Sequence, residues 1–202
     1  MVIAGFVIPS PGLSTPSIRT GPGQVFRGLS NPGDPELLIV PSIRLRAPIV
    51  PISMVSENGE NVLHPPSDYH EVGWWRSSAR PGSPKGQTLL TGHTVHTGGG
   101  VMNELGNLRP GAEIDVKTKR ATIEYYTTKV FVYTKEQLSK HADELFGQNR
   151  PDNRLVLVTC TGWTGSYYTS NIIVFATPVS YTTVTRPAKT AKATSALSAR
   201  SR

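Results

Sequence analysis

The apolar stretches of this chain are short, and glycine or proline separates most of them from the next. The 202 residues include 19 Gly and 17 Pro, which interrupt helices and favour turns. Apolar and polar residues alternate over 43–47, as in a strand with one buried face. Strand-like segments of this kind occur at 37–52, 88–91, 113–117, 122–126, 129–134, 154–159 and 171–176. Such a series predicts an all-β protein of about eight strands, arranged as a closed barrel or a sandwich.

Turns and short helices connect these segments. Asn58-Gly59 is a hairpin-turn signal, and the prolines within 37–52 predict a strand at a sheet edge or at bulges. Thr134 is the expected N-cap of a short helix that continues over 139–146 and ends at Gly147. One or two further helical turns are expected within 101–108.

Composition divides the chain into three parts. Residues 1–36 form a flexible lead-in rich in Pro, Gly and Ser, 37–182 form the folded domain, and 183–202 form a disordered basic tail. The tail contains no acid and holds five of the seven net positive charges. These five are Arg186, Lys189, Lys192, Arg200 and Arg202. A basic tail can bind nucleic acid, but a solvated terminus is the simpler interpretation, so no nucleic-acid partner is expected.

The first eight residues, Met1 to Ile8, are apolar but too few for a transmembrane helix, and Pro9 follows them. No transmembrane segment is therefore predicted, and the sequence leaves open whether these residues belong to a longer membrane anchor. The chain has one cysteine, which excludes an intramolecular disulfide and a cysteine-rich zinc site. No metal or other cofactor is expected.

That cysteine, Cys160, follows a strongly apolar strand and precedes a loop containing Gly162. A thiol is a useful nucleophile only as a thiolate, so it needs a nearby base or cation. His93 has a matching position, because it ends the apolar segment 88–92 and precedes a glycine-rich loop. His96, three residues later and inside that loop, is the alternative imidazole.

The sequence around these residues resembles the sortase family. Leu157-Val158-Thr159-Cys160 is similar to the Thr-Cys strand end of sortases, and Thr91-Gly92-His93 to their Gly-His strand end. Residues 105–114 resemble the family's turn of leucine, proline and glycine. Val72-Gly73-Trp74-Trp75 and the strand 43–52 are similar to those of actinobacterial class E and class F sortases. The resemblance covers about 37–178.

The resemblance implies a closed sortase β-barrel of about eight strands with one or two short helices. It also implies a cysteine transpeptidase that cleaves a Leu-Pro-X-Thr-Gly sorting signal between Thr and Gly, without cofactor or metal. Cys160 would form the thioester, and His93 would be the acid and base. The expected partners are a sorting-signal peptide and an amine of peptidoglycan or pilin. The enzyme would be a monomer at the extracytoplasmic face of the membrane.

One expected feature is missing. Sortases carry an arginine on the strand after the cysteine, where this chain has Asn171 or, in the class F alignment, Thr169. Arg76 and Arg80 are candidate substitutes, and a catalytically weak or inactive peptide-binding or cell-wall-binding barrel is the alternative function. Substrate contacts are expected from Trp75 and from the residues flanking the cysteine: Thr159 beside the substrate or bonded to the loop, and Thr161 and Gly162 as backbone donors to the oxyanion.

Overall fold

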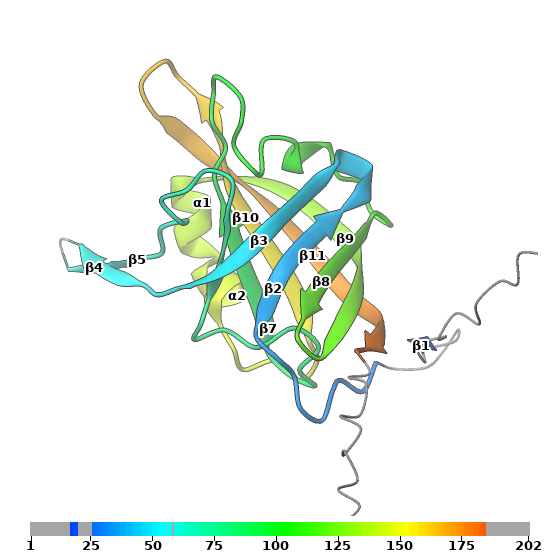
Figure 1. The fold of residues 1–202 in the computed structure, drawn as a ribbon. Helices are drawn as coiled ribbons and strands as arrows, with labels where there is room; N and C mark the ends of the chain where they lie inside the picture. The colour runs from blue at the N-terminus through cyan, green and yellow to red at the C-terminus, as the bar shows by residue number, and fades with distance from the viewer. Residues whose placement is uncertain (1–16, 20–25, 58, 185–202) are drawn as a thin grey trace, which may run out of the picture.

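The computed structural model describes residues 17–19, 26–57 and 59–184. Its main sheet has the strand order β1-β11-β10-β7-β6-β3-β2-β8-β9, and the additional pairing of β11 with β9 closes eight of these strands into a barrel (Figure 1). The strands are β1 (Ser17–Arg19), β2 (Pro35–Val40), β3 (Leu45–Ile52), β4 (Val55–Glu57), β5 (Glu60–Val62), β6 (Val72–Trp75), β7 (Gln87–Gly92), β8 (Glu113–Thr118), β9 (Ala121–Thr134), β10 (Arg154–Trp163) and β11 (Tyr168–Thr183). The predicted barrel and strand number are therefore confirmed.

Alternating side chains fill the barrel interior. Leu38, Leu90, Ile114 and Leu157 come from four different strands, and all are fully buried in one apolar cluster. Complete burial of one such side chain contributes about 1.5–3 kcal/mol. The period-two pattern of the sequence thus corresponds to the inward-facing residues of the barrel.

The segment 37–52 is not one strand, as the sequence suggested, but the hairpin of β2 and β3. A 3-10 turn at Pro41–Ile43 separates the two strands, and Arg44 has a left-handed φ of 54°. Pro48 and Pro51 are tolerated within the sheet because β3 pairs with β2 over Leu45–Pro48 and with β6 only from Ile49 onward. Each half of β3 therefore has one unpaired edge, where a missing N–H costs nothing.

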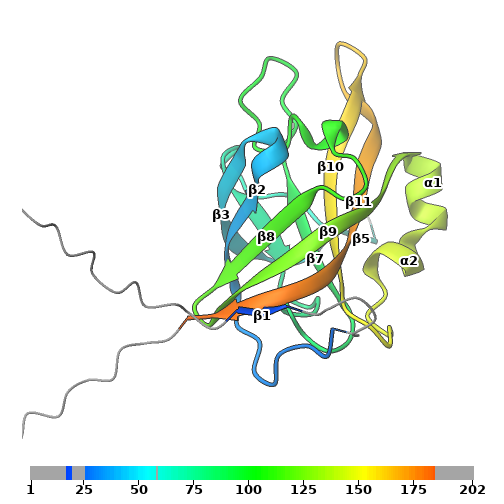
Figure 2. The ribbon, with the colours of Figure 1, turned by 90° about the vertical axis from the view of Figure 1, so that its right-hand side faces the viewer.

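Two short helices, α1 (Lys135–Lys140) and α2 (Ala142–Phe146), lie against the outside of the barrel (Figure 2). The predicted N-cap is confirmed, because Thr134 Oγ1 accepts a hydrogen bond from Gln137 N at 3.2 Å as part of a capping box. Below the helices lies a second apolar cluster that includes Leu89, Leu145 and Val156. The turns expected in 101–108 form a single 3-10 turn at Leu105–Asn107.

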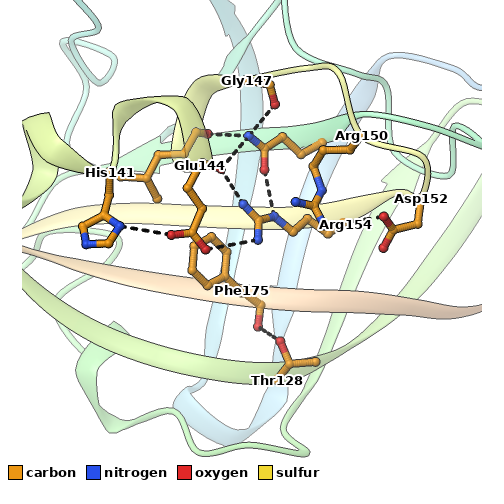
Figure 3. A network of polar contacts seen from close by, with 10 residues as sticks. Thr128, His141, Glu144, Gly147, Arg150, Asp152, Arg154 and Phe175 are labelled. Carbon is orange, nitrogen blue, oxygen red and sulfur yellow. Dashed lines mark hydrogen bonds and ion pairs between the residues drawn. The ribbon is translucent and has the colours of Figure 1, made fainter.

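A polar network fixes α2 to the barrel (Figure 3). Arg154 donates to the Glu144 carbonyl and, at 2.8 Å, to Gln87 Oε1, and its guanidinium lies 4.0 Å above the Phe175 ring. The buried Gln87 amide donates to the carbonyls of Leu145 and Gly147, each at 2.8 Å. The end of α2 is thus bonded directly to β7 and β10.

Described residues that precede the predicted domain boundary at residue 36 already contact the barrel. Leu29 N donates to Gly82 O at 2.7 Å, and the Phe26 ring packs edge-on against Tyr181. β1 pairs with the end of β11. The predicted tail falls mostly on 185–202, outside the described residues, so its boundary remains a prediction. None of the helices in the described residues is long and apolar enough to span a membrane.

Candidate active site

A groove of about 440 Å³ runs along the outside of the barrel between the helices and the segment 61–65. Residues of β7, β10 and β11 line it on the barrel side, and residues of α1 and α2 line it on the helical side. The lining residues are Asn61, Val62, Leu63, Pro65, Leu89, Thr91, Gly92, Lys135, Leu138, Ser139, Ala142, Phe146, Val158, Thr159, Cys160 and Asn171. Most are apolar, and the single cysteine lies among them.

Cys160 is half-buried and lies inside β10, not at the junction of strand and loop that the sequence suggested. The strand continues to Trp163, because Cys160 pairs with Asn171, Thr161 with Ser170, and Trp163 with Tyr168. The pairing of β10 with β11 thus continues beyond the cysteine, in the hairpin that projects from one end of the barrel (Figure 1). The thiol is therefore held on both sides by regular backbone, which limits its motion.

The strand register aligns the end of β7 with the segment that leads to Cys160. β7 and β10 are parallel, with Leu90 opposite Leu157 and Thr91 opposite Val158, where the ladder ends. Extended by two residues, the same register would pair His93 with Cys160. Side-chain bonds continue this alignment past the end of β7. Thr159 Oγ1 donates to Gly92 O at 2.8 Å and lies 2.8 Å from Thr94 Oγ1. Both neighbours of His93 are therefore bonded to the residue that precedes the cysteine.

The His93 ring is oriented by the segment before β6. Its Nε2 lies 2.7 Å from Pro66 O, and the Tyr69 ring packs edge-on against it at 4.8 Å. A carbonyl oxygen can only accept, so Nε2 must carry a hydrogen, which leaves Nδ1 as the nitrogen that can exchange a proton. The groove lining includes Gly92 but not His93, whose ring is turned toward Pro66.

A family model described as the sortase domain matches residues 38–179, which is most of the chain. The chain belongs to the sortase family. It is therefore a cysteine transpeptidase of the sortase type, and its single cysteine lies in the groove. No curated protein matches the sequence.

Solved sortases share its fold. Sortase C-1 of Actinomyces oris is 22% identical, with a TM-score of 0.55, covering 72% of this chain and 73% of that protein. Sortase E1 of Streptomyces coelicolor, solved with a tripeptide in its active site, is 20% identical, with a TM-score of 0.56 and coverages of 75% and 91%. The SrtA sortase of Actinomyces oris is 20% identical, with a TM-score of 0.54 and coverages of 85% and 89%.

In this sortase the resting thiol is not activated by its surroundings alone. Burial raises the pKa of Cys160 above its usual value, and Lys135 and the Asn171 amide oppose that effect only in part. A thiol with a raised pKa keeps its proton at neutral pH. Proton transfer to a base must therefore accompany attack on a substrate.

Asn171 and Thr169, the two candidate replacements for the arginine, have different surroundings. Asn171 lines the groove, and its Nδ2 donates to Thr159 O at 3.3 Å and lies 3.8 Å from Cys160 Sγ. Thr169 Oγ1 instead donates to Gly162 O at 3.1 Å, within the hairpin. Asn171 is thus the one in contact with the nucleophile.

The residues expected to contact the substrate occupy different environments. Thr159 is 1% exposed, and its hydroxyl is bonded to the loop, as one of its two expected roles required. Trp75 does not line the groove but packs edge-on against Phe146, which does. Thr161 and Gly162 lie in β10, and Gly162 has a φ of 73°. A Cβ there would lie 2.5 Å from Thr169 Oγ1, so the hairpin requires glycine.

The remaining candidates lie elsewhere. His96 stacks on Trp163 with ring centroids 4.1 Å apart, and neither residue lines the groove. Arg80 pairs with Asp34 at 2.6 Å, and Arg76 lies with it in a separate pocket. Neither arginine therefore replaces the missing one beside Cys160.

No signal in the sequence predicted that helices form one wall of the groove. Leu138, Ala142 and Phe146 line the groove from α1 and α2, and Lys135 does so from the first residue of α1. The N-cap signal at Thr134 marks where α1 begins but not what it faces. Within the described residues no group of three or more His, Cys, Asp or Glu side chains could hold a metal ion.

Proposed function

We propose that this sortase cleaves a Leu-Pro-X-Thr-Gly type of sorting signal between Thr and Gly, with Cys160 as nucleophile and His93 as acid and base. The observation that carries the proposal is the alignment of Cys160 with His93 through Thr159, beside an apolar groove. An extended peptide with apolar side chains suits such a groove. Its scissile carbonyl would lie over the thiol.

The reaction is a transfer of an acyl group in two steps. Cys160 loses its proton to His93 Nδ1, and the sulfur attacks the Thr carbonyl carbon, whose oxygen becomes negative. Collapse of this intermediate breaks the C–N bond, His93 returns the proton to the departing Gly amine, and the thioester remains on Cys160. An incoming amine then attacks the thioester and gives a proton to His93. The C–S bond breaks, and His93 returns that proton to the departing sulfur of Cys160.

The amine that completes the reaction is proposed to belong to peptidoglycan or to a pilin lysine. With water as acceptor the same chemistry would be hydrolysis. Such acceptors belong to the extracytoplasmic face of the membrane, where we propose that the enzyme acts as a monomer. The specific sorting motif would be set by the groove wall, which includes Leu63, Leu138 and Phe146.

Intact-protein mass spectrometry tests the proposal. The protein is incubated with a library of Leu-Pro-X-Thr-Gly-like peptides, and an acyl adduct that maps to Cys160 is expected. Cys160→Ala should abolish the adduct, and a chelator should not. Absence of any adduct from the whole library would exclude this reaction.

A second function is favoured by one observation, the neutral Asn171 beside Cys160. A barrel without sufficient oxyanion stabilisation would bind a peptide or a cell-wall component without cleaving it. A binding assay and the peptide library together separate the two functions. Peptide binding without acylation of Cys160 would favour the binding protein.

A further inference from the structure

The groove around Cys160 contains one charged side chain among the described residues that line it, and that side chain is Lys135. The others are apolar or neutral, and no carboxylate is among them. A thiolate and a carbonyl oxyanion are both negative, and both are stabilised by a nearby cation. A single lysine in an otherwise uncharged groove is therefore placed where the chemistry needs positive charge.

The fold holds Lys135 near the nucleophile through three neighbouring strands. β10, β11 and β9 lie side by side, with Cys160 opposite Asn171 and Asn171 opposite Tyr133. Thr134, the next residue of β9, is the last in the ladder and caps α1, so α1 begins at Lys135. Tyr133 is thus in register with Cys160 across β11, and Lys135 lies two residues after Tyr133, at the start of α1.

The start of α1 is a rigid place for this side chain. The capping box joins Thr134 and Gln137, with the Gln137 side chain accepting from Thr134 N at 2.9 Å. The next acid, Glu136, accepts a hydrogen bond from Thr134 Oγ1 at 2.8 Å. Lys135 itself has no ion pair with any described residue. Its ammonium group is therefore not neutralised by a partner.

We infer that Lys135 supplies the positive charge of this active site, stabilising the Cys160 thiolate and the oxyanion formed on the substrate carbonyl. The inference rests on the proposed function, and it assigns the electrostatic role of the absent arginine to a residue on a different element. Asn171, which contacts Sγ, would then contribute a neutral hydrogen bond from β11. The two groups would approach the reacting atoms from different elements, Lys135 from the start of α1 and Asn171 from β11.

Other groups on β11 also act on the cysteine. The Asn171 amide lies 3.8 Å from Sγ, and Tyr168 interacts electrostatically with the thiol, whereas the His93 ring is turned toward Pro66. Lys135 is the largest of the influences that lower the pKa of Cys160, ahead of the Asn171 hydrogen bond, while burial raises it. The thiolate in turn contributes, after burial, to a raised pKa of Tyr168. This effect agrees with the place of Lys135 among the residues that line the groove.

The pH dependence of Cys160 alkylation by iodoacetamide, measured on the intact protein, tests the inference without a peptide. Because the pKa of Cys160 is raised, alkylation should accelerate as pH increases from 7 toward 10. Lys135→Gln should move this rise to higher pH, and Lys135→Arg should leave it near that of the unaltered protein. Lys140→Gln, which removes an equal charge from the last turn of α1, is the matched control and should not move it.

Peptide acylation provides the second measurement. Lys135→Gln should lower the rate about ten- to a hundredfold, less than the full loss of a buried oxyanion donor because the lysine is exposed. Adding Asn171→Arg to Lys135→Gln should restore much of the rate, since it returns a cation to the same groove. Thermal unfolding of each variant checks that the fold is intact.

The two measurements test the role of Lys135 and the proposed function separately. Identical alkylation profiles for Lys135→Gln and Lys140→Gln would overturn the inference, and normal acylation by the unaltered protein would at the same time uphold the proposed function. If no peptide acylates the unaltered protein, the proposed function fails, and the alkylation profiles still show whether Lys135 stabilises the thiolate.

Discussion

The two sides of Cys160 differ in how they are built. On the β7 side, Thr159 is buried and bonded to both neighbours of His93, so the cysteine and the histidine are held in one register. On the β11 side, the side chain that contacts the sulfur is the amide of Asn171, and the cation among the described groove-lining residues is an exposed lysine at the start of α1. The first side is fixed by hydrogen bonds, whereas the second depends on weaker and more distant electrostatics.

Under the proposed function, the nucleophile and the proton carrier tolerate little variation in position, whereas the charge that stabilises the oxyanion can come from another element. A proton is transferred only over hydrogen-bond distance, so Cys160 and His93 must be close and aligned. Coulomb interactions decrease more gradually with distance, so a cation can act from more than one place around the groove. Three further substitutions test this comparison.

The largest effect is expected on the β7 side. His93→Ala removes the group that accepts and returns the proton, so acylation should slow by about 10²- to 10⁴-fold. The measurement is the rate of acyl-enzyme formation by mass spectrometry. His96→Ala is the matched control, because His96 is stacked on Trp163 outside the groove, and it should change the rate little. A large loss in His96→Ala with a normal rate in His93→Ala would assign the imidazole to the loop.

A smaller effect is expected on the β11 side. Asn171→Ala removes the amide that contacts the sulfur, and acylation should slow by about ten- to a thousandfold, the range for loss of an oxyanion donor. Thr169→Ala should have less effect, because its hydroxyl is bonded to Gly162 within the hairpin. The same kinetic assay compares the two variants. Equal losses, or a larger one in Thr169→Ala, would contradict the geometry described for this strand.

The last and smallest effect is expected on stability, at the point where Thr159 joins β10 to the end of β7. Thr159→Val keeps the shape of the side chain but leaves Gly92 O and Thr94 Oγ1 without their partner in a buried site. The free energy of unfolding should fall by about 1–3 kcal/mol, as measured by urea denaturation. Thr161→Val is the control, because its hydroxyl has no side-chain bond among those the structure describes. An unchanged stability in Thr159→Val would show that the β7–β10 alignment does not depend on this hydroxyl.

Strand predictions from local pattern were correct in type and less so in extent. The sequence suggested two strands at 122–126 and 129–134, but β9 is continuous over Ala121–Thr134. A β-bulge lies between these two segments of β9. Lys129 pairs with Phe175 and Thr127 with Ala176, so the ladder pairs Thr128 with no residue of β11. Thr128 is the extra residue, and its Oγ1 donates to Phe175 O at 3.0 Å (Figure 3). A bulge interrupts the period-two pattern without ending the strand, so the pattern alone reads it as a boundary.

What the sequence by itself determined is the barrel of short strands and the sortase family, because periodicity and motif are local in the chain, and the same motifs predict that Cys160 acts with His93. Only the tertiary structure decided that Thr159 is bonded to both neighbours of His93, that Arg76 and Arg80 lie in a separate pocket, and that Lys135 lines the groove of Cys160. These relations depend on which strands lie side by side and in what register. They are set by packing of the whole barrel, which no local pattern records.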